Sequence, residues 1–130
     1  MHKFGDVMWL LAATKEYQDW KFSRLQYIFM PPVNLQQFFL FYEDGLPICF
    51  CSYAFVSDDV LAELQTGERS IAPAEWRCGE NIFFPDFVAP FGGTKNFMRT
   101  IMKRFQDDVG PGVKGHWFRP SNMRTGHAIT

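Results

Sequence analysis

The chain has little that would place it in a membrane, in an oxidising compartment or on nucleic acid. No apolar run approaches the roughly 20 residues that a membrane-spanning helix needs. The 130 residues include 13 basic and 14 acidic side chains, so the net charge of −1 provides no general attraction to nucleic acid or anionic lipid. Cysteine is scarce and odd in number, at three, and the chain begins without a signal-peptide pattern. We therefore expect a cytoplasmic protein without a membrane span.

Metal-ligand spacing, internal repeats and low-complexity segments are also missing. Cys49 and Cys51 stand two residues apart in a strand pattern, so they share one face and are expected in the core. No second pair of cysteines or histidines at zinc spacing accompanies them, and we expect no bound metal. The length is enough for one sizeable core and too short for two, which predicts a single domain over residues 1–130.

Aromatic residues, in contrast, are abundant. Hydrophobic residues make up 47% and aromatic residues 18% of the chain, with 15 phenylalanines, and this composition excludes a disordered protein. So many Phe and Met side chains would suit a pocket for an acyl chain, and core packing explains them equally well.

Periodicity and turn residues divide the chain into helices and strands. The helical ranges are 5–15, 22–30, 58–65 and 94–107, with a further helical turn at 71–76. The second helix should end before Pro31, because proline disfavours helical geometry in the residue before it. The strand ranges are 37–42, 48–56, 82–88 and 113–119, and Asp44-Gly45 between the first two predicts an antiparallel hairpin. This order predicts an α+β or mixed α/β domain with a twisted sheet flanked by helices.

One stretch, residues 83–93, combines a carboxylate, apolar neighbours and a Gly-Gly turn. Asp86 lies in a run that predicts a buried strand, where an ionised side chain costs several kcal/mol unless it is paired or hydrogen-bonded. The turn and helix start that follow, Gly92-Gly93-Thr94-Lys95, would present free backbone N–H groups to an anion. A carboxylate beside such a helix start predicts a site that handles an acyl or phosphoryl group.

Several motifs occur in one unbroken order over residues 5–107. They comprise residues 5–12, Trp20, 44–54, 74–76, Gly79, Phe84, Asp86, 89–92, 98–99 and 104–105. In this order and spacing the chain resembles the RTX toxin-activating lysine acyltransferases. The most specific part of the resemblance is Ala89-Pro90-Phe91-Gly92 following an aspartate.

The resemblance implies a single GNAT-like α/β domain that transfers a fatty acyl group from acyl carrier protein to a lysine of a toxin-like protein in the cytoplasm. No cofactor would be bound, since the acyl-thioester is the co-substrate, and its phosphopantetheine arm would face residues 92–95. The catalytic aspartate of the family falls at Asp86. The family's catalytic histidine is replaced by Tyr17, and a family asparagine falls at Ile28.

With Tyr17 at the position of the family's histidine, the sequence is compatible with more than one role for this residue. A tyrosine with a pKa of about 10 is a weak base at neutral pH. Tyr17 could protonate the departing thiolate while Asp86 positions or deprotonates the amine. Alternatively, Tyr17 only packs at a helix exit, the site is inactive, and Asp86 is hydrogen-bonded or paired with Arg77 or Arg99. His116 is a further candidate for a substitute base.

Three functions are compatible with these observations. The first is an acyltransferase that acts from an acyl-thioester carrier onto a lysine or another nucleophile. The second is a catalytically silent relative that binds and antagonises a partner, and the third is a reassigned modifier of another target such as a nucleic-acid base. The partners implied are acyl carrier protein and a toxin-like or other host protein, and a homodimer is an open alternative. A basic cluster would either dock the acidic carrier or be a solvated helix face: Lys95, Arg99, Lys103 and Arg104.

Overall fold

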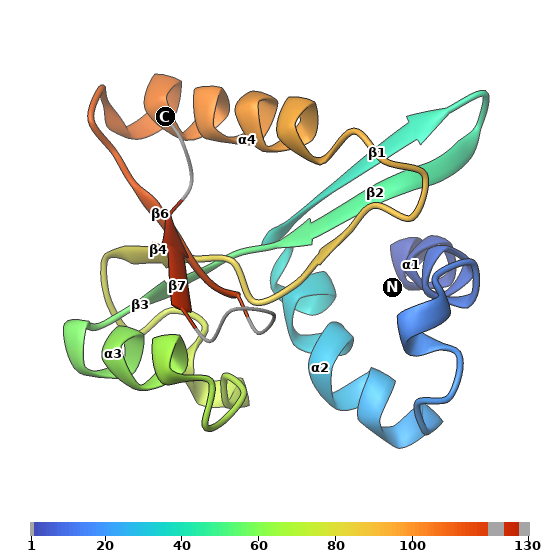
Figure 1. Ribbon diagram of the computed structural model, residues 1–130, viewed down its shortest axis with the longest axis horizontal. Helices are drawn as coiled ribbons and strands as arrows, with labels where there is room; N and C mark the ends of the chain where they lie inside the picture. Colours follow the sequence, from blue (N-terminus) through green and yellow to red (C-terminus); the bar gives the residue numbers. More distant parts are fainter. Residues whose placement is uncertain (1, 120–123, 128–130) are drawn as a thin grey trace. The chain divides into compact units, whose positions relative to one another are not determined.

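The computed structural model describes residues 2–119 and 124–127 of the chain (Figure 1). They fall into two compact units, each with its own sheet. The first unit comprises residues 1–52 and 86–92, and the second comprises residues 53–85 and 93–130. The α/β fold class predicted from the sequence is confirmed, while the assignment of residues 1–130 to a single domain stays a prediction. None of the helices within the described residues has the length and apolarity needed to span a membrane.

The first unit contains a three-stranded antiparallel sheet in the order β1-β2-β5. Its strands are β1 (Phe38–Glu43), β2 (Leu46–Ser52) and β5 (Phe87–Val88). Asp44 and Gly45 join β1 to β2 with φ of 52° and 80°, so both turn residues are left-handed, as a two-residue turn matching the strand twist requires. The predicted hairpin is therefore confirmed.

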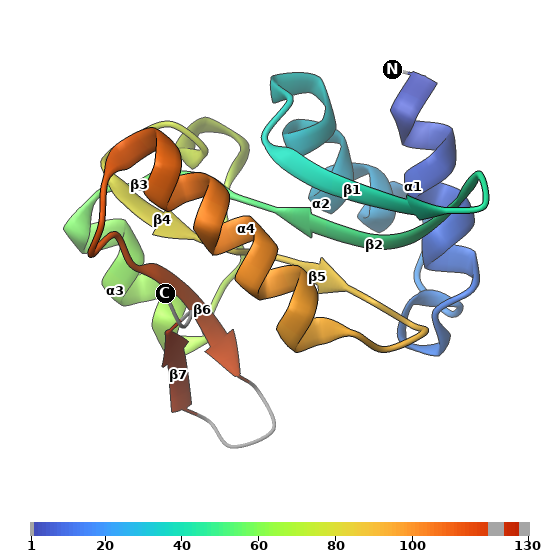
Figure 2. The same ribbon diagram turned by 90° about the horizontal axis from the view of Figure 1, so that it is seen from above.

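Two helices cover one face of this sheet (Figure 2). They are α1 (His2–Ala12) and α2 (Phe22–Leu35), and a 3-10 turn, η1 (Lys15–Tyr17), follows α1. The apolar faces of both helices meet Phe50 of β2 and Val88 of β5 in one core. The buried members of this core from the helices and their connection are Val7, Leu10, Leu11, Tyr17, Leu25, Ile28, Phe29 and Val33.

The prediction that α2 ends before Pro31 is wrong. The helix continues through Pro31 and Pro32 to Leu35, and it ends where Gln36 adopts a left-handed conformation with φ of 58°. Each proline costs the helix one backbone hydrogen bond, but its fixed φ is compatible with helical geometry. Burial of Pro32 and Val33 stabilises this last turn and offsets the loss.

The second unit contains a four-stranded mixed sheet in the order β3-β4-β6-β7. The strands are β3 (Ala54–Val56), β4 (Asn81–Phe83), β6 (Gly115–Arg119) and β7 (Arg124–His127), and only the β4–β6 pair is parallel. The helices α3 (Asp58–Thr66) and α4 (Thr94–Val109) lie on opposite faces of this sheet in Figure 1, and η2 (Pro73–Glu75) is a short 3-10 turn. The β7 strand was not expected from the sequence.

The helices of the second unit follow their sequence signals closely. The Ser57 hydroxyl accepts the backbone N–H of Val60 at the start of α3, and Gly67 ends that helix in a left-handed conformation. The periodicity of α4 predicts a buried face with Phe97, Ile101 and Phe105; Ile101 and Phe105 are buried, whereas Phe97 is only half-buried.

Two predicted strands are each divided between the two sheets. The range 48–56 separates into β2 and β3, and the range 82–88 separates into β4 and β5 with an irregular segment at 84–86. The prediction of one continuous strand around Asp86 is therefore wrong. Pro85 has no N–H to donate to a strand ladder. The N–H groups on either side of it donate to different sheets: the Phe84 N–H to the His116 carbonyl, and the Asp86 N–H to the Ser52 hydroxyl.

Candidate functional site

The main chain of Asp86 is fixed on the end of β2. Its N–H donates to the Ser52 hydroxyl at 3.1 Å, and its carbonyl accepts the Ser52 N–H at 3.0 Å. Ser52 itself is fully buried, so this pair of hydrogen bonds is shielded from water. The Asp86 side chain, in contrast, is only half-buried. These two hydrogen bonds therefore fix the backbone from which the Asp86 carboxyl group extends.

The electrostatic surroundings of Asp86 hold its carboxyl group close to neutrality. Within the described residues this carboxylate makes no ion pair and accepts no hydrogen bond, unlike a carboxylate whose role is structural. Burial raises its pKa to about 7, the negative charge of Glu16 adds to the increase, and the Arg24 cation opposes it. At physiological pH the group therefore exchanges readily between its carboxylate and carboxylic acid forms.

Tyr17 is a buried aromatic residue at the end of η1. Its ring packs edge to face against Trp20 and Phe29, with ring centroids 4.8 and 5.6 Å apart. Burial, and then the negative charges of Asp86 and Glu16, raise the pKa of the Tyr17 phenol far above its usual range. The phenol therefore stays neutral at physiological pH and acts as a hydrogen-bond donor rather than a base. The structure brings Tyr17 and Asp86, the two predicted catalytic residues, into one unit and one electrostatic environment.

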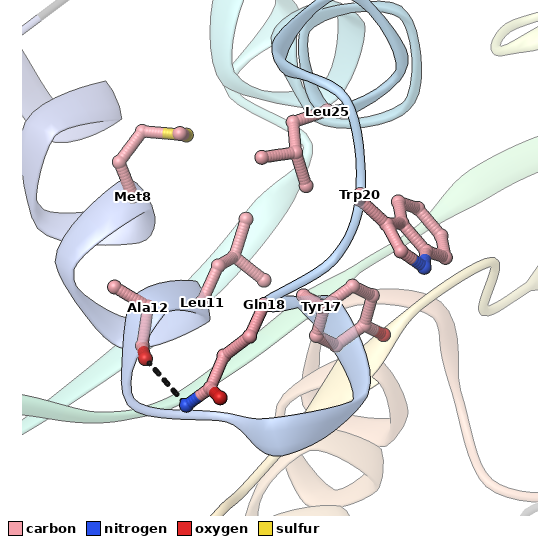
Figure 3. A pocket seen from close by; sticks show the side chains of 7 residues that line it. All are labelled: Met8, Leu11, Ala12, Tyr17, Gln18, Trp20 and Leu25. Carbon is pink, nitrogen blue, oxygen red and sulfur yellow. Dashed lines mark hydrogen bonds between the residues drawn. The ribbon is translucent and has the colours of Figure 1, made fainter.

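A pocket of about 200 Å³ opens beside Tyr17 (Figure 3). Its lining comes from the end of α1, the connection to α2 and the first turn of α2, and consists of Met8, Leu11, Ala12, Tyr17, Gln18, Trp20 and Leu25. The amide nitrogen of Gln18, the most polar side chain of the lining, donates a hydrogen bond to the Ala12 carbonyl at 3.2 Å. In Figure 3 the Tyr17 oxygen lies on the side of the ring that faces away from Leu11 and Ala12. The ring is thus a wall of the pocket, and the hydroxyl group lies beyond it.

Three residues of this environment were missed by the sequence analysis: Glu16, Arg24 and Ser52. Arg24 stacks its guanidinium group 4.5 Å from the centre of the Trp20 ring, which holds this cation near the site. Ser52 had a signal in the sequence, since it is a hydroxyl at the end of an otherwise apolar strand. Glu16 and Arg24 had none, because their effect on Asp86 depends on tertiary structure.

The residues predicted to bind the donor occupy the turn into α4. Gly92 is the last residue of the first unit, Gly93 is the N-cap of α4 with φ of 86°, and Thr94 and Lys95 form the first turn. All four are exposed. The left-handed conformation at Gly93 explains the glycine, because a side chain is strained there.

The other candidate residues have structural explanations or stay untested. Burial raises the pKa of the Cys49 thiol to about 12 and that of the Cys51 thiol well above its usual range, so both are core residues as predicted. Two cations of the basic cluster pair within α4, Lys103 with Asp107 at 3.6 Å and Arg104 with Asp108 at 3.5 Å. His116 lies on β6 in the second unit, and its proposed role as a base stays a prediction.

Comparison with known proteins connects this site to one family. The model of the RTX toxin acyltransferase family matches residues 1–125. An RTX-II toxin-activating lysine-acyltransferase of Actinobacillus pleuropneumoniae is 29% identical over 96% of this chain and 76% of its own length. A lysine-acyltransferase of Vibrio cholerae is 35% identical over 77% of this chain and 66% of its own length. A protein-lysine myristoyltransferase of Escherichia coli is 27% identical over 81% of this chain and 60% of its own length. Together these matches show that the chain belongs to the RTX toxin acyltransferase family.

Proposed function

We propose that this protein transfers an acyl group from the thioester of an acyl carrier protein to a lysine amine of a protein acceptor. The relatives described above are lysine-acyltransferases by name, and they supply the reaction type. The observation that carries the proposal is the Asp86 carboxyl group, held by Ser52, unpaired within the described residues and with a pKa of about 7. Such a group is suited to general acid–base catalysis at neutral pH.

In the proposed reaction Asp86 both accepts and returns a proton. The lysine amine attacks the thioester carbonyl carbon, a C–N bond forms, and the nitrogen passes a proton to the Asp86 carboxylate. The tetrahedral intermediate then collapses, the C–S bond breaks, and the sulfur leaves with the electron pair. The protonated Asp86 has a pKa of about 7, below the value of about 8.5 for a thiol, so returning its proton to the thiolate is favourable.

Tyr17 serves this reaction as a neutral hydrogen-bond donor. Its raised pKa makes full proton transfer to a thiolate unfavourable, which argues against the general-acid role considered from the sequence. In the reaction the O–H would turn from the Glu16 carboxylate, with which it interacts, to the oxyanion or thiolate, which it would stabilise without ionising. Tyr17 and Asp86 are both proposed catalytic residues, the first as donor and the second as proton shuttle.

We further propose that the phosphate of the donor's pantetheine arm binds at the turn formed by Gly92, Gly93, Thr94 and Lys95. Its ligands there would be the backbone N–H groups of Gly93, Thr94 and Lys95, because the Gly92 N–H donates to the Ala89 carbonyl at 3.1 Å. Support comes from the exposed N-terminus of the 16-residue helix α4, where unpaired N–H groups favour an anion. Thr94→Pro tests this placement, because proline is accommodated at the first helical position and removes only one N–H group. A proline at Gly93 is unsuitable, since φ is 86° there.

An acyl-transfer assay with acyl carrier protein and a lysine-bearing acceptor tests the proposed function. We expect transfer by the wild type, its loss in Asp86→Asn, and unchanged transfer in the control Asp19→Asn, which replaces an exposed carboxylate. Transfer that survives Asp86→Asn would show that Asp86 is not the proton shuttle.

A second candidate function is a catalytically silent relative that binds a partner. The observation favouring it is that Tyr17, at the position of the family's catalytic histidine, is buried and packs against Trp20 and Phe29 as a core residue does. This candidate predicts no transfer by the wild type with any acyl chain, together with partner binding that Asp86→Asn leaves unchanged.

A further inference from the structure

We propose that Ser52 is a positioning residue for the acyl transfer. Its hydroxyl group takes the place of a main-chain carbonyl in the ladder between β2 and β5, and it thereby ends that ladder at Asp86. Asp86 serves the transfer only under the proposed function, on which the role of Ser52 therefore rests. The placement of the Asp86 carboxyl group can be measured without transfer, so the two proposals can fail separately.

The register of β2 and β5 brings Ser52 opposite Asp86. The two strands are antiparallel and Cys51 pairs with Phe87, so the next pair along the ladder is Ser52 with Asp86. In an antiparallel ladder every second pair exchanges two N–H···O=C hydrogen bonds. The Ser52 N–H makes one of these two bonds, since it donates to the Asp86 carbonyl at 3.0 Å. The pair therefore occupies a hydrogen-bonded position of the ladder.

The second hydrogen bond of this pair is replaced. In a regular ladder the Asp86 N–H would donate to the Ser52 carbonyl, but it donates to the Ser52 hydroxyl at 3.1 Å. The Ser52 carbonyl accepts instead the Cys51 thiol, a weak donor, at 3.6 Å. As a result β5 begins only at Phe87. A serine hydroxyl competing with a carbonyl for a backbone N–H is a known way of interrupting regular structure.

Alternation along the strands places this pair on the face of the sheet that the helices cover. Phe50 and Val88 belong to the core that this face forms with α1 and α2. Side chains two residues apart in a strand share a face, so Ser52 lies on the face of Phe50 and Asp86 follows on that of Val88. Tyr17 is a member of the same core, and the negative charge of Asp86 acts on its phenol. The backbone position of Asp86 therefore sets the distance between the two proposed catalytic groups.

Removal of the hydroxyl group would leave the Asp86 N–H with only the main-chain carbonyl of residue 52 as an acceptor in its own pair. An N–H shielded from water is costly to leave without an acceptor. Because Ser52 is fully buried, we expect the main chain at Asp86 to turn toward that carbonyl and to lengthen the ladder by one pair. The carboxyl group would move with the main chain. A misplacement of about 1 Å in an active site can lower the rate by about 100-fold.

The experiment compares Ser52→Ala and Ser52→Cys with the wild type and with Ser57→Ala. Both changes at Ser52 remove the oxygen that accepts the Asp86 N–H, and cysteine nearly keeps the side-chain volume while its sulfur is a weak acceptor. Ser57→Ala is the matched control, because the Ser57 hydroxyl also accepts a backbone N–H, that of Val60 at 3.3 Å, but belongs to the second unit. Two properties are measured: kcat and KM for transfer from acyl carrier protein, and the pKa of Asp86 from carboxyl ¹³C NMR without substrates.

We expect both Ser52 variants to lower kcat by ~10- to 100-fold with little change in KM. In both variants the pKa of Asp86 should move away from about 7 in the same direction, because it depends on the burial of the carboxyl group and on the charges of Glu16 and Arg24. Ser57→Ala should lower the unfolding temperature by a few degrees and leave kcat and the pKa of Asp86 unchanged.

The outcomes separate positioning from stability and from the proposed function. An unchanged pKa of Asp86 in the Ser52 variants, or an equal loss of kcat in Ser57→Ala, would overturn the role of Ser52. If the wild type transfers no acyl group but the pKa of Asp86 moves in the Ser52 variants alone, the positioning of Asp86 by Ser52 stands and the proposed function fails. Ser52→Cys decides the matter if Ser52→Ala does not fold, because it leaves the smaller change in packing.

Discussion

Replacing Asp86 with asparagine should make the protein more stable at alkaline pH while removing its activity. Folding raises the pKa of this carboxyl group from an ordinary 3.8 to about 7. A group whose pKa rises on folding favours the native state while it is protonated, and that contribution is lost as pH increases through the folded value. A difference of about three pKa units corresponds to about 4 kcal/mol. Because Asp86 is partly exposed, solvent screening reduces this figure, and we expect roughly 2 kcal/mol.

The assay is urea unfolding of the wild type and Asp86→Asn at a series of pH values. At pH 8 the variant should be more stable by about 2 kcal/mol, and the difference should shrink between pH 7 and pH 4 as the wild-type carboxyl group becomes protonated. Asp19→Asn, at an exposed position, should change stability by no more than about 0.5 kcal/mol at any pH. A variant less stable than the wild type at pH 8, or an advantage that persists unchanged at pH 4, would refute this account of the charge.

Three further predictions address the surroundings of Asp86 and the donor. Glu16→Gln should lower the pKa of Asp86 and move the acidic limb of the transfer–pH profile to lower pH. Arg24→Gln should raise that pKa and move the acidic limb to higher pH. Shifts of both variants in the same direction would contradict the assigned effects of the two charges. Tyr17→Phe should keep the ring packing and reduce the transfer rate by ~10²- to 10³-fold in single-turnover kinetics, and an unchanged rate would exclude the donor role. Thr94→Pro should raise the KM for acyl carrier protein without changing the unfolding temperature, and an unaltered KM would remove the helix start from the donor site.

The elements that the sequence predicted best are those with a local signature. The Asp44-Gly45 turn and the Ser57 cap each depend on a few adjacent residues, and both are found where they were expected. The division of the range 82–88 was missed because its apolar residues run without a change of period across the break. Pro85 is the one local feature of the break, since it has no N–H for a strand ladder, but the direction of the chain after it is set by the hydrogen bond from Asp86 to Ser52, 34 residues away. Such a distant partner leaves no mark on the local pattern.

In the candidate site, too, the features that depend on adjacent residues were predicted, and those that depend on tertiary contacts were not. Asp86 was identified from its unusual setting, a carboxylate among apolar residues, and the raised pKa follows from that burial. Its association with Tyr17 came only from the resemblance to the acyltransferase family, since nothing in residues 15–17 indicates a distant carboxylate. Glu16 and Arg24, which act on Asp86 in opposite directions, were not identified from the sequence at all.

The electrostatics of the first unit make the proposed acyl transfer compatible with a tyrosine at position 17. A histidine contributes a base with a pKa of about 6.5, and a buried phenol cannot replace that function. Asp86, with a pKa of about 7, already supplies a group that gains and loses a proton in the same range. The Tyr17 ring is buried in the core of the first unit and its phenol keeps its proton, so in the proposed reaction it would act only as a hydrogen-bond donor. Under the proposed function, the proton-transfer role would therefore fall to the Asp86 carboxyl group alone.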